Sequence, residues 1–371
     1  MKLFCEKAPL VTALSNVTRA VSSKSPIMAL EGILLKAQGN QLTLTGYDLE
    51  MGIVTVMDAN IKEEGKIVLS AKLLFDMIRG IPSDTISIET DNKFLTVIRG
   101  GATEYTILGI DPDEYPDLPE ITEGESVTID QETLKSMIGQ TLFAVATSDS
   151  KPVHKGSMFD IKDGAANLVS VDGYRLALRR EAILFGGDME FIVPGKTLSE
   201  VSKLIKDDKE EPAQAELFLS RRHIIFRIEN YQVISRLLEG EFLDYKAAIP
   251  TGEVSEAVVN VRELIESVER TSLLISDKLR SPLRVTFEEN TIHINCTTSI
   301  GKAYDSCPCE LKGSKLEMGF NNRYLLDALK AAGCEKVKLL LGGPLAPMRI
   351  VPIDDDRFLF LVLPVRLKSE N

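Results

Sequence analysis

Three groups of charged residues share one spacing, in which a basic, an acidic and a second basic residue stand at positions i, i+4 and i+7. This spacing places the three side chains of a group on one face of a helix. Basic side chains without base-reading groups beside them can contact a phosphate backbone weakly and without sequence preference. A solvated helix face is the competing interpretation. The groups are Lys72, Asp76 and Arg79; Lys196, Glu200 and Lys203; and Arg323, Asp327 and Lys330.

The sequence matches the motifs of catalytic sites only weakly. Segment 191–197 (FIVPGKT) places Gly-Lys-Thr before a helix, but a phosphate-binding loop requires a further glycine where Glu190 stands. A turn at 194–195 that enters a helix explains the segment with less assumption. Asp48 and Asp172 could form paired carboxylates, yet each lies in a strand–turn–strand setting in which Asp stabilises the turn. We therefore predict no catalytic residues, and an enzyme whose site forms between repeats is the weaker alternative.

The cysteines do not form a recognisable framework. Five Cys, an odd number, argue against a set of disulfides. Cys307 and Cys309 lack the second pair and the His spacing of a zinc site. We expect free thiols, and we predict neither a metal nor a cofactor.

The charged groups recur at nearly constant distance, 124 and then 127 residues apart, which is about a third of the 371-residue chain. In each group the residues two and five places after the first basic one are apolar or small, as an amphipathic helix requires. A repeat much longer than the ~20–50 residues of solenoids indicates whole similar domains. We predict domains at 1–122, 123–250 and 251–371.

Other segments follow the same period. Each third opens with a helix-like stretch, continues with an alternating strand-like run that contains a turn, and closes with strands after its second helix. This order predicts an α+β fold. The predicted helices are 6–21, 69–81, 130–145, 193–206, 260–275 and 319–332; the runs with a turn are 41–51, 167–178 and 291–304; the closing strands are 94–108, 222–238 and 347–365.

Composition indicates a soluble globular chain, with 44% hydrophobic and 26% charged residues. No uncharged apolar run approaches the ~18–20 residues of a membrane helix, and the first residues carry charges where a signal peptide is apolar. We predict a cytoplasmic protein that does not contact a membrane. The net charge is −12, but the six predicted helices carry +3 and the rest of the chain −15. Helices that share one surface would make that surface mildly basic on a strongly acidic body.

Five motifs, in order along the whole chain, carry a family resemblance. They are 42–51 (LTLTGYDLEM), 171–176 (VDGYRL), 239–250 (EGEFLDYKAAIP), 320–329 (FNNRYLLDAL) and 363–367 (LPVRL). Together they are similar to the motifs of bacterial DNA sliding clamps, the beta subunits of the replicative DNA polymerase.

The resemblance implies a homodimer of three similar α+β clamp domains per chain. Helices would line a ring around duplex DNA, and strands would form its outer layer. Such a clamp is a non-catalytic processivity factor that tethers the polymerase. The implied partners are duplex DNA, the catalytic subunit of the replicative polymerase, an ATP-dependent clamp loader, and repair and translesion polymerases that bind through short peptide motifs.

The resemblance also implies three sets of site residues. Lys24, Lys72, Arg79, Lys196 and Lys203 would contact DNA, and Tyr105, Ile107, Leu273 and Leu274 would lie at the dimer interface. Ala248 and His154 depart from the side chains common in the family, and 368–371 extend past its usual end. The peptide pocket would include Val171, Gly173, Tyr174, Arg175, Leu176, Leu243, Ala248, Leu279, Asn321, Tyr324, Leu345, Pro347, Leu361, Val362, Leu363, Pro364, Val365, Arg366 and Leu367.

Overall fold

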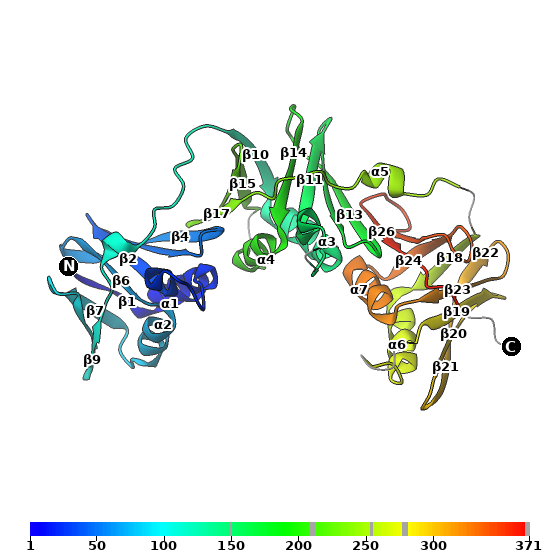
Figure 1. Ribbon diagram of the computed structural model, residues 1–371, viewed down its shortest axis with the longest axis horizontal. Helices are drawn as coiled ribbons and strands as arrows, with labels where there is room; N and C mark the ends of the chain where they lie inside the picture. The colour runs from blue at the N-terminus through cyan, green and yellow to red at the C-terminus, as the bar shows by residue number, and fades with distance from the viewer. Residues whose placement is uncertain (149, 208–211, 253–254, 277–280, 368–371) are drawn as a thin grey trace. The chain divides into compact units, whose positions relative to one another are not determined.

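The computed structural model describes residues 1–148, 150–207, 212–252, 255–276 and 281–367 (Figure 1). Helices account for 25% and strands for 45% of the chain, which makes the fold α+β as predicted. The chain divides into two compact units. Unit 1 comprises Met1–Glu132 and Glu200–Leu237, and unit 2 comprises Thr133–Ser199 and Leu238–Asn371.

Unit 1 contains two antiparallel sheets, with strand orders β10-β15-β16-β17-β4-β3-β2-β6 and β5-β1-β7-β8-β9. Helices α1 (Lys7–Val17) and α2 (Ala71–Gly80) pack against each other. The strands are β1 (Lys2–Glu6), β2 (Gly32–Gln38), β3 (Gln41–Tyr47), β4 (Met51–Asp58), β5 (Asn60–Glu63), β6 (Gly65–Ser70), β7 (Thr85–Thr90), β8 (Leu95–Gly100), β9 (Thr103–Leu108), β10 (Glu125–Asp130), β15 (Gln214–Leu219), β16 (His223–Ile228) and β17 (Tyr231–Arg236).

Unit 2 repeats this arrangement, with strand orders β14-β11-β12-β13-β26-β25-β24-β18-β22 and β21-β20-β19-β23. Helices α6 (Val261–Ser272) and α7 (Asn322–Ala332) pack against each other, and α5 (Tyr245–Ala248) is a short helix. The strands are β11 (Gly156–Lys162), β12 (Ala165–Val171), β13 (Arg175–Ala182), β14 (Met189–Pro194), β18 (Ser255–Asn260), β19 (Leu283–Glu288), β20 (Thr291–Thr298), β21 (Gly301–Pro308), β22 (Glu310–Lys312), β23 (Leu316–Phe320), β24 (Lys336–Leu341), β25 (Met348–Val351) and β26 (Phe358–Val362).

All six predicted helices are present, and each is shorter than its sequence pattern. Helices α3 (Gln131–Thr141) and α4 (Gly195–Leu204) begin in one unit and end in the other. Strand β14 ends at Pro194 and α4 begins at Gly195, so the chain passes from strand to helix at 194–195 as the sequence indicated, and Gly-Lys-Thr forms the first residues of the helix. Short 3-10 turns, such as η1 (Thr18–Ala20) and η4 (Leu142–Ala144), follow the first helices.

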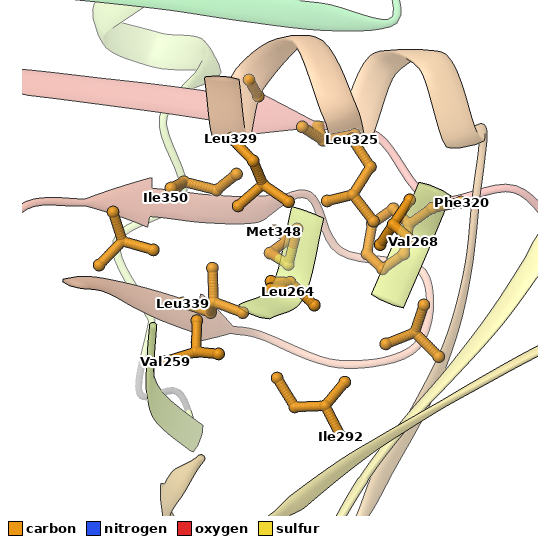
Figure 2. Close-up of a cluster of buried hydrophobic side chains, with 14 of the residues drawn as sticks. Val259, Leu264, Val268, Ile292, Phe320, Leu325, Leu329, Leu339, Met348 and Ile350 are labelled. Atoms are coloured by element: carbon orange, nitrogen blue, oxygen red, sulfur yellow. The ribbon is translucent and has the colours of Figure 1, made fainter. Parts of the chain in front are cut away.

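The core of unit 2 shows why these segments are amphipathic. Figure 2 shows Leu264 and Val268 of α6 and Leu325 and Leu329 of α7 turned toward apolar side chains from the strands. Two asparagines, which cap the first turns of these helices, define where the helices begin. At the other end of α7, Gly333 adopts φ 63°, a left-handed conformation that ends a helix at little cost.

The predicted Asp turns are confirmed. The Asp48 carboxylate accepts hydrogen bonds from the backbone amides of residues 50 and 51, and the Asp172 carboxylate accepts them from residues 174 and 175. Each turn joins two paired strands, β3 to β4 and β12 to β13. These carboxylates are therefore turn-forming groups, as the simpler sequence interpretation held.

The sequence interpretation missed several strands in each third, among them the strand that precedes the first helix. Strands β1, β10 and β18 lie directly before α1, α3 and α6, and each pairs with a strand far away in the chain, β7, β15 and β24. In the part of the chain that the structure describes, no helix has the length and apolarity needed to cross a membrane.

Candidate functional site

A rim of exposed apolar side chains lies in unit 2. The exposed fractions are 61% for Tyr174, 37% for Leu243, 61% for Leu345, 38% for Leu363 and 40% for Val365. Exposed large apolar side chains that gather in one unit are more informative than single ones, because such groups mark interaction sites. All five belong to the set that the family resemblance assigned to a peptide pocket. We call them the apolar rim.

The turn after β12 positions the first residue of the apolar rim. Gly173 adopts φ 91°, which glycine tolerates better than other residues, and the chain then presents the Tyr174 ring to solvent. The backbone carbonyl of Tyr174 accepts a hydrogen bond from the Leu363 amide at 2.9 Å. The Tyr174 ring stacks on the Tyr324 ring with centroids 5.8 Å apart. The end of β26 and the start of α7 are thus held beside this turn.

Two cavities meet at Val365. One, of about 430 Å³, is lined by residues that include Asn321, Tyr324 and Val365. The other, of about 510 Å³, is lined by Leu345, Val365, Leu367 and neighbouring residues. The Val365 amide donates a 2.8 Å hydrogen bond to the Gly319 carbonyl, so the chain after β26 runs beside β23. Cavities that combine apolar side chains with polar groups are suited to anchoring short peptides.

Several predicted pocket residues form the floor beneath the apolar rim and are buried. Val171, Leu176 and Leu361 are 4%, 2% and 3% exposed and pack with Phe242 and Tyr245 in one cluster. Leu176 and Leu361 face each other in the β13–β26 pair, which explains their joint burial. The structure therefore places them in the core, where a ligand reaches them only if covering side chains move.

Arg175 links the apolar rim to helix α7. Its guanidinium donates a 2.9 Å hydrogen bond to Asp172 and a second one to Asp327, and its side chain is 11% exposed. It lies 4.5 Å from the ring centre of Tyr324 and 5.5 Å from that of Phe143. A buried guanidinium is tolerated because two carboxylates and two ring faces surround it.

The remaining predicted pocket residues have varied settings. Gly173 and Arg366 are exposed, Val362 is fully buried, and Asn321 caps α7 through its side chain. Leu279 and the tail 368–371 lie outside the described residues. Half-buried positions are Ala248, Tyr324, Pro347, Pro364 and Leu367.

His154 lies beneath the site in η5 (Pro152–Lys155). It is 6% exposed, and its ring meets the Phe242 ring edge-to-face at 5.3 Å. Burial lowers the pKa of His154, and the nearby Lys151 lowers it further, so the ring is neutral at pH 7. A neutral imidazole packs here much as an apolar side chain would.

The three charged helix faces are formed as predicted, since every basic member is exposed. The acidic members differ. Asp76 pairs with Arg79 at 3.3 Å and Glu200 with Lys203 at 2.7 Å, both within their own helices. Asp327 instead binds Arg175. Lys24 is exposed in the loop that follows η1.

The predicted dimer residues lie on or near two sheet edges. Strand β9 ends the five-stranded sheet of unit 1, and β21 ends the four-stranded sheet of unit 2. Tyr105 and Ile107 are half-buried on β9, and Leu274 is half-buried after α6, next to Leu273, which is 83% exposed. Alternation along β9 also exposes Leu108 to 72%, a candidate that the sequence interpretation missed.

The cysteines are free thiols, four of them buried. Burial raises the pKa of Cys307 to about 12, so this thiol is protonated and unreactive at neutral pH. Among the described residues, no group of three or more His, Cys, Asp or Glu is placed to hold a metal ion.

Comparison with known proteins identifies the family. Models of the DNA polymerase III beta subunit match in three consecutive parts: the N-terminal domain at residues 1–119, the central domain at 128–244 and the C-terminal domain at 246–366. The chain belongs to this family. It is a DNA polymerase processivity clamp.

Individual relatives agree along the whole length. The beta sliding clamp of Bacillus subtilis is 31% identical, and the match covers 99% of this chain and all of that protein. The crystal structure of a DNA polymerase sliding clamp from Bacillus subtilis has a TM-score of 0.95 at 30% identity, covering 99% of this chain and 100% of the other. A putative beta subunit from Eubacterium rectale has a TM-score of 0.93 at 32% identity, covering 98% and 99%.

Proposed function

We propose that two copies of this chain close into a ring that encircles duplex DNA and slides along it, without a catalytic site of its own. The observation that carries the proposal is a pair of sheet ends in one chain, β9 in unit 1 and β21 in unit 2. Each end presents backbone groups and exposed apolar side chains, as edge strands that pair with another chain do. Pairing of β9 with β21 of a second copy, made twice, closes a dimer.

Four basic residues of the helix faces, together with Lys24 in the loop after η1, would contact DNA. Lys24, Lys72, Arg79, Lys196 and Lys203 are exposed cations on long side chains that can reach phosphates. Two acidic–basic pairs, Asp76 with Arg79 and Glu200 with Lys203, lower the net charge of these faces. Contacts of this kind hold DNA weakly, which suits a ring that must move along the duplex.

The apolar rim and the two cavities beside it would receive short peptide segments of partner proteins. These partners are the catalytic subunit of the replicative polymerase, the ATP-dependent clamp loader, and repair and translesion polymerases. A related clamp from Pseudomonas aeruginosa has been crystallised bound to griselimycin. We propose that griselimycin binds to the apolar rim of this chain as well. The proposed setting is the cytoplasm, and the proposed domains are 1–122, 123–250 and 251–371.

The ring proposal is tested by mass and by topology. A particle of about twice 40.9 kDa is expected in solution. After loading, the protein should remain on circular DNA and leave linear DNA by its ends. Equal retention on both forms would contradict encirclement, since a groove binder does not distinguish them.

The peptide site is tested by removing residues 365–371. This deletion takes away Val365, which lies between the two cavities. It should abolish binding of griselimycin and of fluorescent peptides copied from the polymerase catalytic subunit. The mass of the dimer should not change, because β9 and β21 are untouched. Full affinity in the deletion variant would refute this site.

A further inference from the structure

Helix α5 directly follows Leu243 of the apolar rim but is too short to be stable by itself. It spans only Tyr245–Ala248, and isolated helices need ~12–15 residues to persist in water. Leu243 stands just before it and Ala248 is its last residue. The Asp244 side chain accepts a 3.1 Å hydrogen bond from the Ala247 amide and caps its first turn. The position of α5 must therefore depend on contacts outside the helix.

The Tyr245 ring packs in the apolar cluster described above, and one buried carboxylate supplies the polar contacts. Asp160 lies on β11 and is 7% exposed. Its Oδ2 atom accepts a 2.6 Å hydrogen bond from the Tyr245 hydroxyl and lies 2.9 Å from the Lys246 ammonium group. Lys246 also lies 5.4 Å from the centre of the Tyr245 ring. One oxygen atom thus holds the first two residues of α5.

Charge explains why Asp160 needs this partner. Asp160 stands directly opposite Glu190 in the β11–β14 pair, and like charges in that position repel. Lys246 provides the opposite charge. In the first repeat, 124 residues earlier, the opposed pair is Lys36 and Lys66. The acidic pair, and with it this anchor, is therefore not shared by the first repeat.

The protonation states suit the arrangement. Burial would raise the pKa of Asp160, but hydrogen bonds from Tyr245 and Lys246 outweigh it and hold that pKa below its ordinary value. Burial, with the hydrogen bond to Asp160, raises the pKa of Tyr245. At neutral pH the carboxylate is therefore charged and the tyrosine remains a donor.

We infer that Asp160 is a positioning residue for peptide binding, which anchors α5 through Tyr245 and Lys246 and so fixes Leu243 of the apolar rim and the nearby Ala248. The inference rests on the proposed peptide site. Asp160 does not contact the ligand. It acts through the helix, and its loss lets α5 and the segment before it leave the surface of β11.

The experiment compares three variants of the full chain. Asp160→Asn removes the charge, Tyr245→Phe removes only the hydroxyl, and Ser157→Ala is the matched control. Ser157 lies on the same strand, is fully buried, and shares a 2.7 Å hydrogen bond with Ser170 of β12. Griselimycin affinity is measured by calorimetry, thermal stability by scanning calorimetry, and the mobility of 243–249 by amide hydrogen exchange without ligand.

Asp160→Asn and Tyr245→Phe should each weaken griselimycin binding by about tenfold and accelerate exchange in 243–249. Ser157→Ala should lower thermal stability while leaving affinity within about twofold and the exchange of α5 unchanged. A merely structural role would make the affinities of all three variants fall with their stability. Should Asp160→Asn fail to fold, the milder Tyr245→Phe still decides.

Two results would overturn the inference. In the first, the wild-type chain binds griselimycin, but Asp160→Asn and Tyr245→Phe show the same affinity or the same hydrogen exchange in α5 as Ser157→Ala. This result would refute the inference and leave the proposed peptide site standing. Failure of the wild-type chain to bind griselimycin would refute the proposed peptide site, and the inference with it.

Discussion

Two junctions in the molecule share a backbone and differ in their side chains. In unit 1, β4 pairs with β17, and the Arg236 amide donates a 2.9 Å hydrogen bond to the Glu50 carbonyl. In unit 2, β13 pairs with β26, and the Leu363 amide donates one of the same length to the Tyr174 carbonyl. Both junctions follow an Asp turn. In each of the two repeats, an isolated β-bridge also joins the outermost strand, β6 or β14, to the segment that continues into the next repeat.

The side chains at equivalent positions have opposite character. Exposed Glu50 and Arg236 in unit 1 correspond to exposed Tyr174 and Leu363 in unit 2. Main-chain hydrogen bonds do not depend on the identity of the side chains, so both repeats keep the same fold. Affinity for a peptide, in contrast, requires apolar side chains at the surface. The comparison teaches that the fold is present in both places and the proposed peptide site in only one.

The largest expected effect is on stability beneath the apolar rim. Leu176 is 2% exposed, and its replacement by Ala should lower the free energy of unfolding by about 2–5 kcal/mol. The corresponding residue in unit 1 is Gly52, and the Leu118 side chain occupies the space that a side chain at this position would need. Denaturant titration measures the change. A loss of peptide affinity without a loss of stability would instead place Leu176 on a ligand-accessible surface.

Exchanging the rim side chains should remove binding. Tyr174→Glu combined with Leu363→Arg gives unit 2 the side chains of unit 1, and we expect griselimycin affinity to fall by about a hundredfold. Glu50→Gln with Arg236→Gln is the control in unit 1 and should leave affinity unchanged. Calorimetric titration of both double variants decides. Binding that survives the first exchange would show that these two side chains do not distinguish the junctions.

Substitutions on the charged helix faces should change how DNA binding depends on salt concentration. Replacing Lys72, Arg79, Lys196 and Lys203 by Glu should weaken retention on DNA by roughly tenfold or more and flatten its dependence on salt concentration. Circular dichroism should show an intact fold, since these side chains are exposed. Retention and a salt slope equal to those of the wild type would mean that these faces do not meet DNA.

The smallest expected effect is a gain in stability in unit 1. Leu49 adopts φ 75°, where unit 2 has Gly173 at φ 91°. A leucine pays a steric cost in this region that glycine avoids, and Leu49 is 49% exposed, so its removal loses limited burial. Leu49→Gly should raise the free energy of unfolding by about 0.5–1 kcal/mol. Gly173→Ala, the reverse change in unit 2, should destabilise by a similar amount.

Local patterns in the sequence predicted much of this fold. The charged and apolar periods of α2, α4 and α7 specify those helices, and the Asp turns depend only on amides two and three residues ahead. Strands β1, β10 and β18 escaped prediction because their pairing partners lie far along the chain and their own segments are short. Pairing between strands so far apart in the chain leaves no recognisable pattern in either segment.

The site was predicted less completely for the same reason. Family motifs named the pocket residues but not which of them are buried, since burial of Leu176 depends on Leu361 across a strand pair. The contact between Arg175 and Asp327 joins residues 152 positions apart. The Asp160 anchor was missed too, although the motif at 239–250 contains Tyr245 and Lys246 and could have prompted a search for an acidic partner.

Under the proposed pairing of β9 with β21 of a second copy, each chain has two different ends through which it can be joined. With both strands intact, two copies would complete a closed assembly. A variant whose β21 cannot pair could still bind one neighbour through β9 but could not bind a second one through β21. Such a variant would leave the assembly open. Mixed with the wild type, it would yield open pairs, and a minority of defective copies would deplete closed rings out of proportion to their number.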